Sequence, residues 1–345
     1  MRSSAATAGL ALALATAWPL VLVTAAAQTP APRTTTRPAT TTVTGDTGLW
    51  FVPTASIPPA RSWGMSAYRV SFDYEQGFTN VANWALTFGV GALDRAELFG
   101  GLTVVTRIDR DVRPLFFPTP EDSRAAGVVN EYPFVRTGWT GNQLGDLWLG
   151  AKFIVFSPQG DAPAAVAVRA MVKVPTAGQD HGAGTGKVDV AVDTVLSAEI
   201  NERVELSVFG GYILRGDPPQ YDLLNGVRWG FGAALPTRRH LRLVAELHGE
   251  TYTGDYVTGR GPAMQATAFR QKSPVNATIA MTWLGTSGLF AGAGVSWNSR
   301  IQGRSHFGSF QDEPGDALGF QIRVGYHTGS RMHAAFVLPR RDGRR

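Results

Sequence analysis

His248 carries the side chain best placed for acid–base or metal chemistry in this sequence. Glu246 and Glu250 lie two residues before it and two residues after it. In an extended strand these three side chains point to the same face, so one imidazole and two carboxylates would share it. Those groups can transfer protons or ligate a metal ion. The alternative is a ladder of solvated polar side chains, and we therefore predict no catalytic residue and no metal site here.

A second short motif, His181–Lys187, resembles a phosphate-binding loop. That loop requires Gly at the place of His181 and Ser or Thr at the place of Val188, and no helical periodicity follows it. We interpret its glycines as residues of a tight turn. The sequence contains no G-x-S-x-G or H-E-x-x-H motif and no cysteine. It therefore predicts a protein that is not an enzyme and binds no cofactor.

Charged side chains recur in mid-strand positions along the chain. In residues 165–174, apolar side chains occupy one face, while Arg169 and Lys173 share the other. The next run, residues 187–199, places Asp189 and Asp193 on one face in the same way. By the same alternation, the charged face comprises Arg69, Asp73, Glu97, Lys152, Arg169, Lys173, Asp189, Asp193, Glu205, Arg228, Arg242, Glu246, His248 and Arg323.

This mixed-charge face would point away from lipid if the strands cross a membrane, because Arg or Lys at the bilayer midplane costs about 2–4 kcal/mol. The charges would then line a barrel lumen. They either set the selectivity of a water-filled conduit, or they pair across a narrow lumen and seal it. A barrel of about twelve strands is wider than the eight-stranded kind that side chains fill. Two segments could plug it: Gly45–Arg61 and Ile108–Gln143.

Alternating runs of about ten residues recur between residues 63 and 327. They predict about twelve strands, with fourteen as the alternative. The links between them alternate in length, which a soluble sandwich has no reason to maintain. The short links are Gly91–Arg95, Ser157–Ala164, Asn201–Arg203, Pro236–His240 and Gly285–Gly288. The others are mostly longer: Gln76–Asn83 (the shortest of that set), Ile108–Gln143, Pro175–Gly186, Arg215–Asn225, Thr253–Pro274 and Asn298–Asp316.

These patterns predict an all-β fold, a transmembrane antiparallel up-and-down β-barrel with short periplasmic turns and long extracellular loops. The composition agrees, since charged residues are 17% of the chain, below the roughly 25% of average soluble domains. The net charge of +5 is scattered, which excludes a nucleic-acid partner. Aromatic residues near strand ends are expected to form interfacial girdles: Trp84, Tyr212, Tyr252, Trp283, Trp297 and Tyr326.

The N-terminus has the features of an export signal. Arg2 precedes an apolar stretch, and Ala25–Ala27 form an A-x-A cleavage pattern before Gln28. We expect cleavage between Ala27 and Gln28 and localisation in the outer membrane. The expected organisation is a signal peptide (1–27), a disordered Thr/Pro-rich tether (28–44), an entry or plug segment (45–62), the barrel (63–327) and a basic tail (328–345).

Several short segments of the central strands match a known family. They are Leu144–Leu147, Leu149–Lys152, Val172–Thr176, Gly184–Gly186 with Asp189, and Glu205–Gly216. These segments resemble the outer-membrane barrels of the transporter-like family named from the MetA-pathway of phenol degradation, and Gly45–Thr54 with the long loop resembles barrels found ahead of OmpA-like domains. The similarity is clearest over Gly141–Gly232 and implies an outer-membrane barrel.

The sequence thus favours a passive channel or transporter for small solutes of unknown identity, with a mixed-charge lumen. The alternative is a closed structural or surface-interaction barrel that acts through its long loops. The expected partners are outer-membrane lipid and, as the fold implies, the periplasmic barrel-assembly machinery.

Overall fold

The computed structural model describes residues 34–36, 40–74, 79–110, 130–135, 139–156, 164–179, 182–201, 203–260, 268–299, 317–328 and 331–333. The expected signal peptide lies outside the described residues, as do most of the expected tether and basic tail. Within the described residues, no helix has the length and apolarity needed to cross a membrane.

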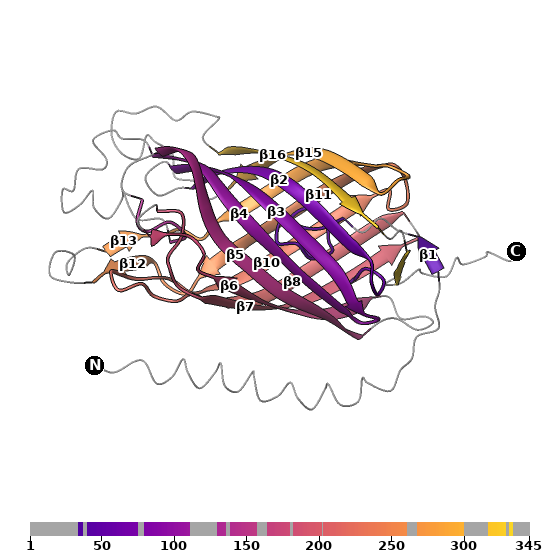
Figure 1. Ribbon diagram of the computed structural model, residues 1–345, viewed down its shortest axis with the longest axis horizontal. Helices are drawn as coiled ribbons and strands as arrows, with labels where there is room; N and C mark the ends of the chain where they lie inside the picture. Colours follow the sequence, from indigo (N-terminus) through magenta and orange to yellow (C-terminus); the bar gives the residue numbers. More distant parts are fainter. Residues whose placement is uncertain are drawn as a thin grey trace, which may run out of the picture.

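Antiparallel strands close into one barrel, each paired with the next and the last with the first (Figure 1). The strand number is twelve, which confirms the first prediction and not the alternative of fourteen. In order, the strands are β2 (Trp63–Tyr74), β3 (Thr79–Leu93), β4 (Ala96–Arg110), β5 (Trp139–Phe156), β6 (Ala165–Val174), β7 (Asp189–Ile200), β8 (Val204–Leu214), β10 (Gly226–Leu235), β11 (Leu241–Tyr252), β14 (Val275–Leu284), β15 (Leu289–Asn298) and β16 (Leu318–His327).

The outer surface of the barrel is apolar. On β14, the side chains of Ile279, Met281 and Trp283 are exposed, while the residues between them are buried. This period-two pattern follows from the pleat, which sends successive side chains to opposite faces. The predicted girdle aromatics are exposed on this surface apart from Tyr252, which is half-buried. The prediction that Tyr252 belongs to a girdle was wrong. Tyr252 lies an even number of residues after Glu246 in β11, so both side chains point to the inner face.

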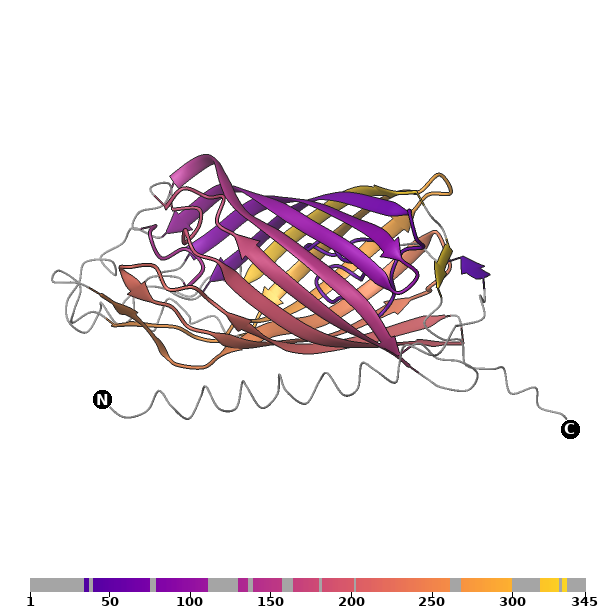
Figure 2. The ribbon, with the colours of Figure 1, turned by 60° about the horizontal axis from the view of Figure 1, so that its bottom comes forward.

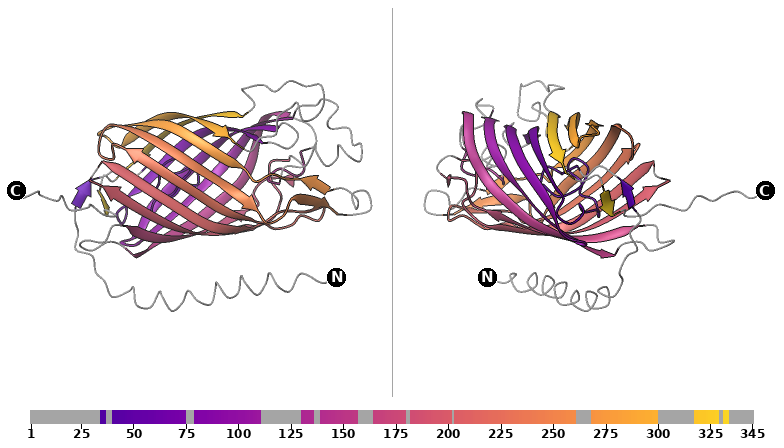
Figure 3. Two further views of the ribbon diagram at one scale, coloured as in Figure 1. Left: turned by 180° about the vertical axis from the view of Figure 1, so that it is seen from behind. Right: turned by 45° about the vertical axis from the view of Figure 1, so that its right-hand side comes forward.

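The two ends of the barrel differ in the length of the links that connect the strands. At one end, turns such as Gly285–Gly288 are short; at the other, a small sheet forms from β9 (Tyr221–Asp222), β12 (Tyr256–Gly259) and β13 (Ala268–Arg270). At the short-turn end, β1 (Thr34–Thr36) pairs with β17 (Arg331–His333). Figure 1 shows β12 and β13 at the barrel end opposite to β1, and Figure 3 shows the tilted strands from two further sides.

Residues 40–62, here called the plug segment, fold inside the barrel (Figure 2). They include the end of the range expected as a tether and all of the range expected as an entry or plug segment. Leu49, Trp50 and Val52 are fully buried and pack against inward residues of β2, β11 and β14. Gly45 permits the close approach, since its φ is +103° and a Cβ there would lie 2.2 Å from the Gly100 carbonyl oxygen.

Candidate functional site: a charged lumen closed by the plug segment

Cross-strand register produces a row of charged residues around one side of the lumen. Glu97 on β4 is the register partner of Lys152 on β5, and Lys152 is in turn the partner of Arg169 on β6. Arg169 is the partner of Asp193 on β7. Two cations are therefore directly opposed at the centre of the row, an arrangement that destabilises a sheet unless a carboxylate intervenes.

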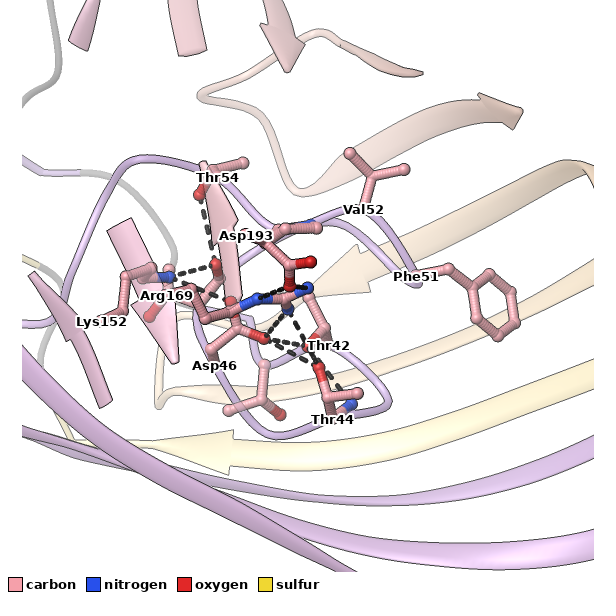
Figure 4. A network of polar contacts seen from close by, with 12 residues as sticks. Thr42, Thr44, Asp46, Phe51, Val52, Thr54, Lys152, Arg169 and Asp193 are labelled. Atoms are coloured by element: carbon pink, nitrogen blue, oxygen red, sulfur yellow. Dashed lines mark hydrogen bonds and ion pairs between the residues drawn. The ribbon is translucent and has the colours of Figure 1, made fainter. Parts of the chain in front are cut away.

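Asp46 of the plug segment supplies that carboxylate (Figure 4). Its Oδ1 lies 3.0 Å from Arg169 Nη1, and its Oδ2 lies 3.3 Å from Lys152 Nζ. All three side chains are fully removed from solvent. Thr42 and Thr44 donate hydrogen bonds to Oδ1 at 2.6 and 2.9 Å. Oδ1 therefore accepts from three donors and Oδ2 from the Lys152 ammonium, so both oxygens of the buried carboxylate are compensated.

The charge state of Asp46 follows from these contacts. Burial raises the pKa of this carboxyl, but the positive charges of Arg169 and Lys152 and the hydrogen bonds from the two Thr hydroxyls outweigh burial and lower its pKa from 3.8 to about 2. Asp46 is therefore ionised at neutral pH. The plug segment is held in the lumen by a full negative charge between two buried cations.

Each cation of the row also pairs with a carboxylate of the barrel wall. Lys152 Nζ lies 2.9 Å from Glu97 Oε2, and Arg169 Nη2 lies 2.6 Å from Asp193 Oδ2. Arg228 of β10 reaches the same Asp193 oxygen at 3.3 Å. Five residues that the sequence places on the charged face thus join one network, and the plug segment completes it.

Glu246 holds the plug segment at a second point. Its Oε1 accepts hydrogen bonds from the backbone N–H groups of Trp50 at 3.1 Å and Val52 at 2.9 Å. Phe51 N–H donates to the same carboxylate. A carboxylate that accepts from consecutive amides fixes the local turn of the chain. Glu246 is thus engaged by the plug segment and is not free to act as a base or metal ligand.

Arg323 of β16 holds it at a third point. Its guanidinium lies 4.3 Å from the centre of the Trp50 ring, a cation–π distance. It also donates to the Leu49 carbonyl oxygen at 2.5 Å and to Thr282 Oγ1 at 2.7 Å. Trp50 Nε1 donates to the same Thr282 hydroxyl at 3.1 Å. Indole and guanidinium therefore share one wall hydroxyl.

His248 does not form a joint site with its two neighbouring carboxylates. Its ring stacks on Phe51 of the plug segment, with centroids 4.6 Å apart. Glu246 binds the plug backbone, and Glu250 instead pairs with Arg215, which directly follows β8. The three side chains share a face, as the spacing indicates, but each is used by a different partner.

The other residues of the predicted charged face lie as follows. Lys173 contacts Asp189 at 2.6 Å, and Arg242 pairs with Glu205.

Arg69 does not face the lumen, and this prediction was wrong. On β2 it has the outward parity of the exposed Met65, whereas Tyr68 and Val70 are buried on the inner face. Its guanidinium donates to the Val70 carbonyl oxygen at 2.9 Å. Asp73 lies in β2, but its side chain is outside the described residues.

Sequence reasoning missed several members of the lumen: Asp46, Trp50, Glu131, Asp146 and Arg215. Asp46 carried a usable signal, because it is the sole charged residue between positions 40 and 60. The segment was expected to enter a lumen that contains cations. Its one carboxylate could therefore have been expected to pair with a cation of the wall. Glu131 and Arg215 lie in loops, where no alternation assigns a face.

A cavity of about 160 Å³ opens above the plug segment at the long-loop end. It lies between the ends of the wall strands and the loop residues Asn130–Tyr132. The charged residues of its lining are Lys173, Asp146, Asp189, Glu131 and Arg215. The cavity therefore combines both signs of charge with the rings of Tyr132 and Trp148.

No protein family and no curated protein sequence matches the chain. Among solved structures, it is similar to an outer membrane channel from Pseudomonas putida F1, with a TM-score of 0.54 and 9% identity over 79% of this chain and 98% of that one. The fold is the outer-membrane barrel fold. The KdgM porin and the NanC porin are more distant, each with a TM-score of 0.42, identities of 6% and 8%, and coverage of 76% and 77% of this chain and 98% of each porin.

Proposed function

We propose that the protein is an outer-membrane channel for small solutes whose conduit is closed by the plug segment. The observation that carries the proposal is the way in which Asp46 is held. Ion pairs and hydrogen bonds tie Asp46 to the wall, and they stabilise the docked plug segment only while the carboxylate is charged and faces its two cations. Displacement of the plug segment would leave a wall that carries both signs of charge, the lining of an aqueous conduit.

The outer surface supports a place in the bacterial outer membrane. The apolar outward rows suit lipid, and the inward charges suit a lumen. In this placement the long loops are extracellular, the short turns are periplasmic, and the chain reaches the membrane after cleavage between Ala27 and Gln28. The assembly machinery for such barrels would then be a partner. The sequence resemblance to the MetA-pathway family supports the same placement, and no catalytic role is part of the proposal.

Planar-bilayer conductance tests the proposal. The purified wild-type protein should show small or rare openings, and Asp46→Asn should open more often because one plug contact loses its charge. A matched control is Asp94→Asn, which changes an exposed turn residue and should leave the openings as in the wild type. Folded, inserted protein that conducts in neither the wild type nor Asp46→Asn would overturn the channel.

One observation favours the alternative, a closed barrel that acts through its loops. The central charges Glu97, Lys152, Arg169 and Asp193 are fully buried and paired, which is the arrangement of a seal. In that case the small sheet of β9, β12 and β13 would provide the binding surface. Loss of surface binding on removal of residues 256–270, which include β12 and β13, with the barrel still folded, would support this function.

A further inference from the structure

The cavity above the plug segment has an excess of negative charge. Lys173 and Arg215 are its cations. Lys173 Nζ contacts Asp189 Oδ2 at 2.6 Å and Asp146 Oδ2 at 3.3 Å. Arg215 pairs with Glu250 and, at 3.2 Å, with Glu131 Oε1. Two cations thus pair with four carboxylates. Three of these carboxylates, Glu131, Asp146 and Asp189, line the cavity, so the formal charge of the lining is −1.

The donors of these cations are already in use. Lys173 Nζ also donates to Thr185 Oγ1 at 3.0 Å, which brings it to three partners. Arg215 donates from Nη1 to the Leu224 carbonyl oxygen at 2.9 Å and from Nη2 to Glu250 at 2.9 Å. An anionic ligand would therefore find both cations engaged, and would meet excess carboxylate as well.

Glu131 has the unused acceptor. Its Oε1 accepts from Arg215 and, at 3.1 Å, from the Tyr252 hydroxyl. Its Oε2 is withdrawn from solvent and has no hydrogen-bond partner among the described residues. Burial raises the pKa of the Glu131 carboxyl more than Arg215 lowers it, and Glu250 raises it further. The Glu131 side chain is 28% exposed and lines the cavity, so a further positive charge in the cavity would lie beside it and compensate its carboxylate.

The size and the walls of the cavity limit what could bring that charge. Its volume is about 160 Å³, and an apolar cavity of about 150 Å³ holds one benzene molecule. Trp148, Tyr132 and Ile213 form part of the lining. Aromatic faces attract cations and apolar rings alike. A fitting ligand therefore has a positive group on a carbon skeleton of about one ring.

We propose that this cavity binds a compact organic ammonium ion, with the ammonium at Glu131 and the carbon skeleton against Trp148 and Tyr132. The inference rests on the proposed function where it makes this ion a solute of the channel. The binding itself requires only the folded barrel. Its location at the long-loop end makes the cavity the first site that such a solute meets before the plug segment.

Calorimetric titration of the full-length folded barrel in detergent tests the binding. The probes are benzylamine, its neutral analogue benzyl alcohol and the anion benzoate, at equal detergent concentration. We expect saturable binding of benzylamine only. Equal heats for benzylamine and benzyl alcohol, or tighter binding of benzoate, would overturn the proposal without the use of any variant.

Variants then locate the site. Glu131→Gln should weaken benzylamine binding at least about tenfold, the loss expected when a charge-assisted hydrogen bond becomes a neutral one. Glu131→Asp retains the charge and should bind within about threefold of the wild type. The matched control is Asp222→Asn, an exposed carboxylate paired with Arg260. Unchanged affinity in folded Glu131→Gln would show that the ammonium binds elsewhere.

The two proposals can fail separately. A barrel that binds benzylamine at Glu131 and never conducts would retain the binding site and refute the channel. A barrel that conducts without saturable benzylamine binding would retain the channel and refute this site.

Discussion

Lys152 and Arg169 are directly opposed cross-strand partners of β5 and β6, and the Asp46 carboxylate lies between them. Each cation also has a wall carboxylate, Glu97 or Asp193. With the plug segment in place, three carboxylates therefore surround two cations, and the row is satisfied from the wall and from the lumen. Because two like charges face each other in the wall, the carboxylate of the plug segment offsets their repulsion and stabilises the barrel.

Asp46→Asn should lower the free energy of unfolding by about 3–5 kcal/mol, the cost typical of removing one partner from a buried ion pair. The substitution keeps the shape of the side chain but leaves Lys152 and Arg169 with one carboxylate each. Denaturant unfolding in detergent measures the loss, and hydrogen exchange of residues 40–62 should become faster. Asp94→Asn, in an exposed turn, should stay within about 0.5 kcal/mol of the wild type. Similar effects of both substitutions would refute the role of Asp46.

Acidification should release the plug segment over a defined range. The pKa of Asp46 is about 2 in the folded protein, below its ordinary 3.8. A depressed folded-state pKa stabilises the docked state fully above the unfolded pKa and less as pH falls through the folded one. The contribution, about 2 kcal/mol, should therefore be present above about pH 5 and fall away toward pH 2. Hydrogen exchange of residues 40–62 across this range measures it, and Asp46→Asn should abolish the step attributable to this group.

Trp50 should contribute through both its ring and its indole N–H. Trp50→Ala removes the packing, the contact with Arg323 and the hydrogen bond to Thr282, and should cost about 3–5 kcal/mol. Trp50→Phe keeps a ring under the guanidinium and should cost clearly less. Unfolding by denaturant compares the two. Equal losses would mean that the ring contact with Arg323 adds nothing to docking.

A cross-link should lock the plug segment, and the absence of cysteine from the chain makes the experiment clean. The hydroxyls of Thr41 and Ser66 contact each other between plug segment and wall. In the pair Thr41→Cys with Ser66→Cys, oxidation should suppress conductance and a reductant should restore it.

The wall offers the matched control for that cross-link. Thr278 and Ser296 are register partners on β14 and β15, with hydroxyl oxygens 2.5 Å apart. Oxidation of Thr278→Cys with Ser296→Cys joins two strands without touching the plug segment, so conductance should persist. Conductance that persists in the oxidised Thr41 and Ser66 pair would show that solutes pass without movement of the plug segment.

The sequence by itself determined the strands and, apart from β2, their two faces. Alternation is a local property of the pleat, so Arg169 and Lys173 could be assigned to one face without knowledge of any partner. Link lengths then indicated which ends of the strands meet, and the apolar rows such as Ile279 and Met281 indicated the outer surface. The same reasoning assigned Glu246 and His248 to the lumen, and their inward parity in β11 agrees.

The tertiary structure decided which charges meet. Lys152 and Arg169 became neighbours through the register of β5 and β6, which the turn between the strands and the burial of one face set. Asp46 entered their row through contacts with residues 106 and 123 positions away. Glu246 accepts from Trp50 across 196 positions. Such partners depend on the shape and charge of the closed lumen. They cannot be predicted from periodicity along the chain, which is a local property.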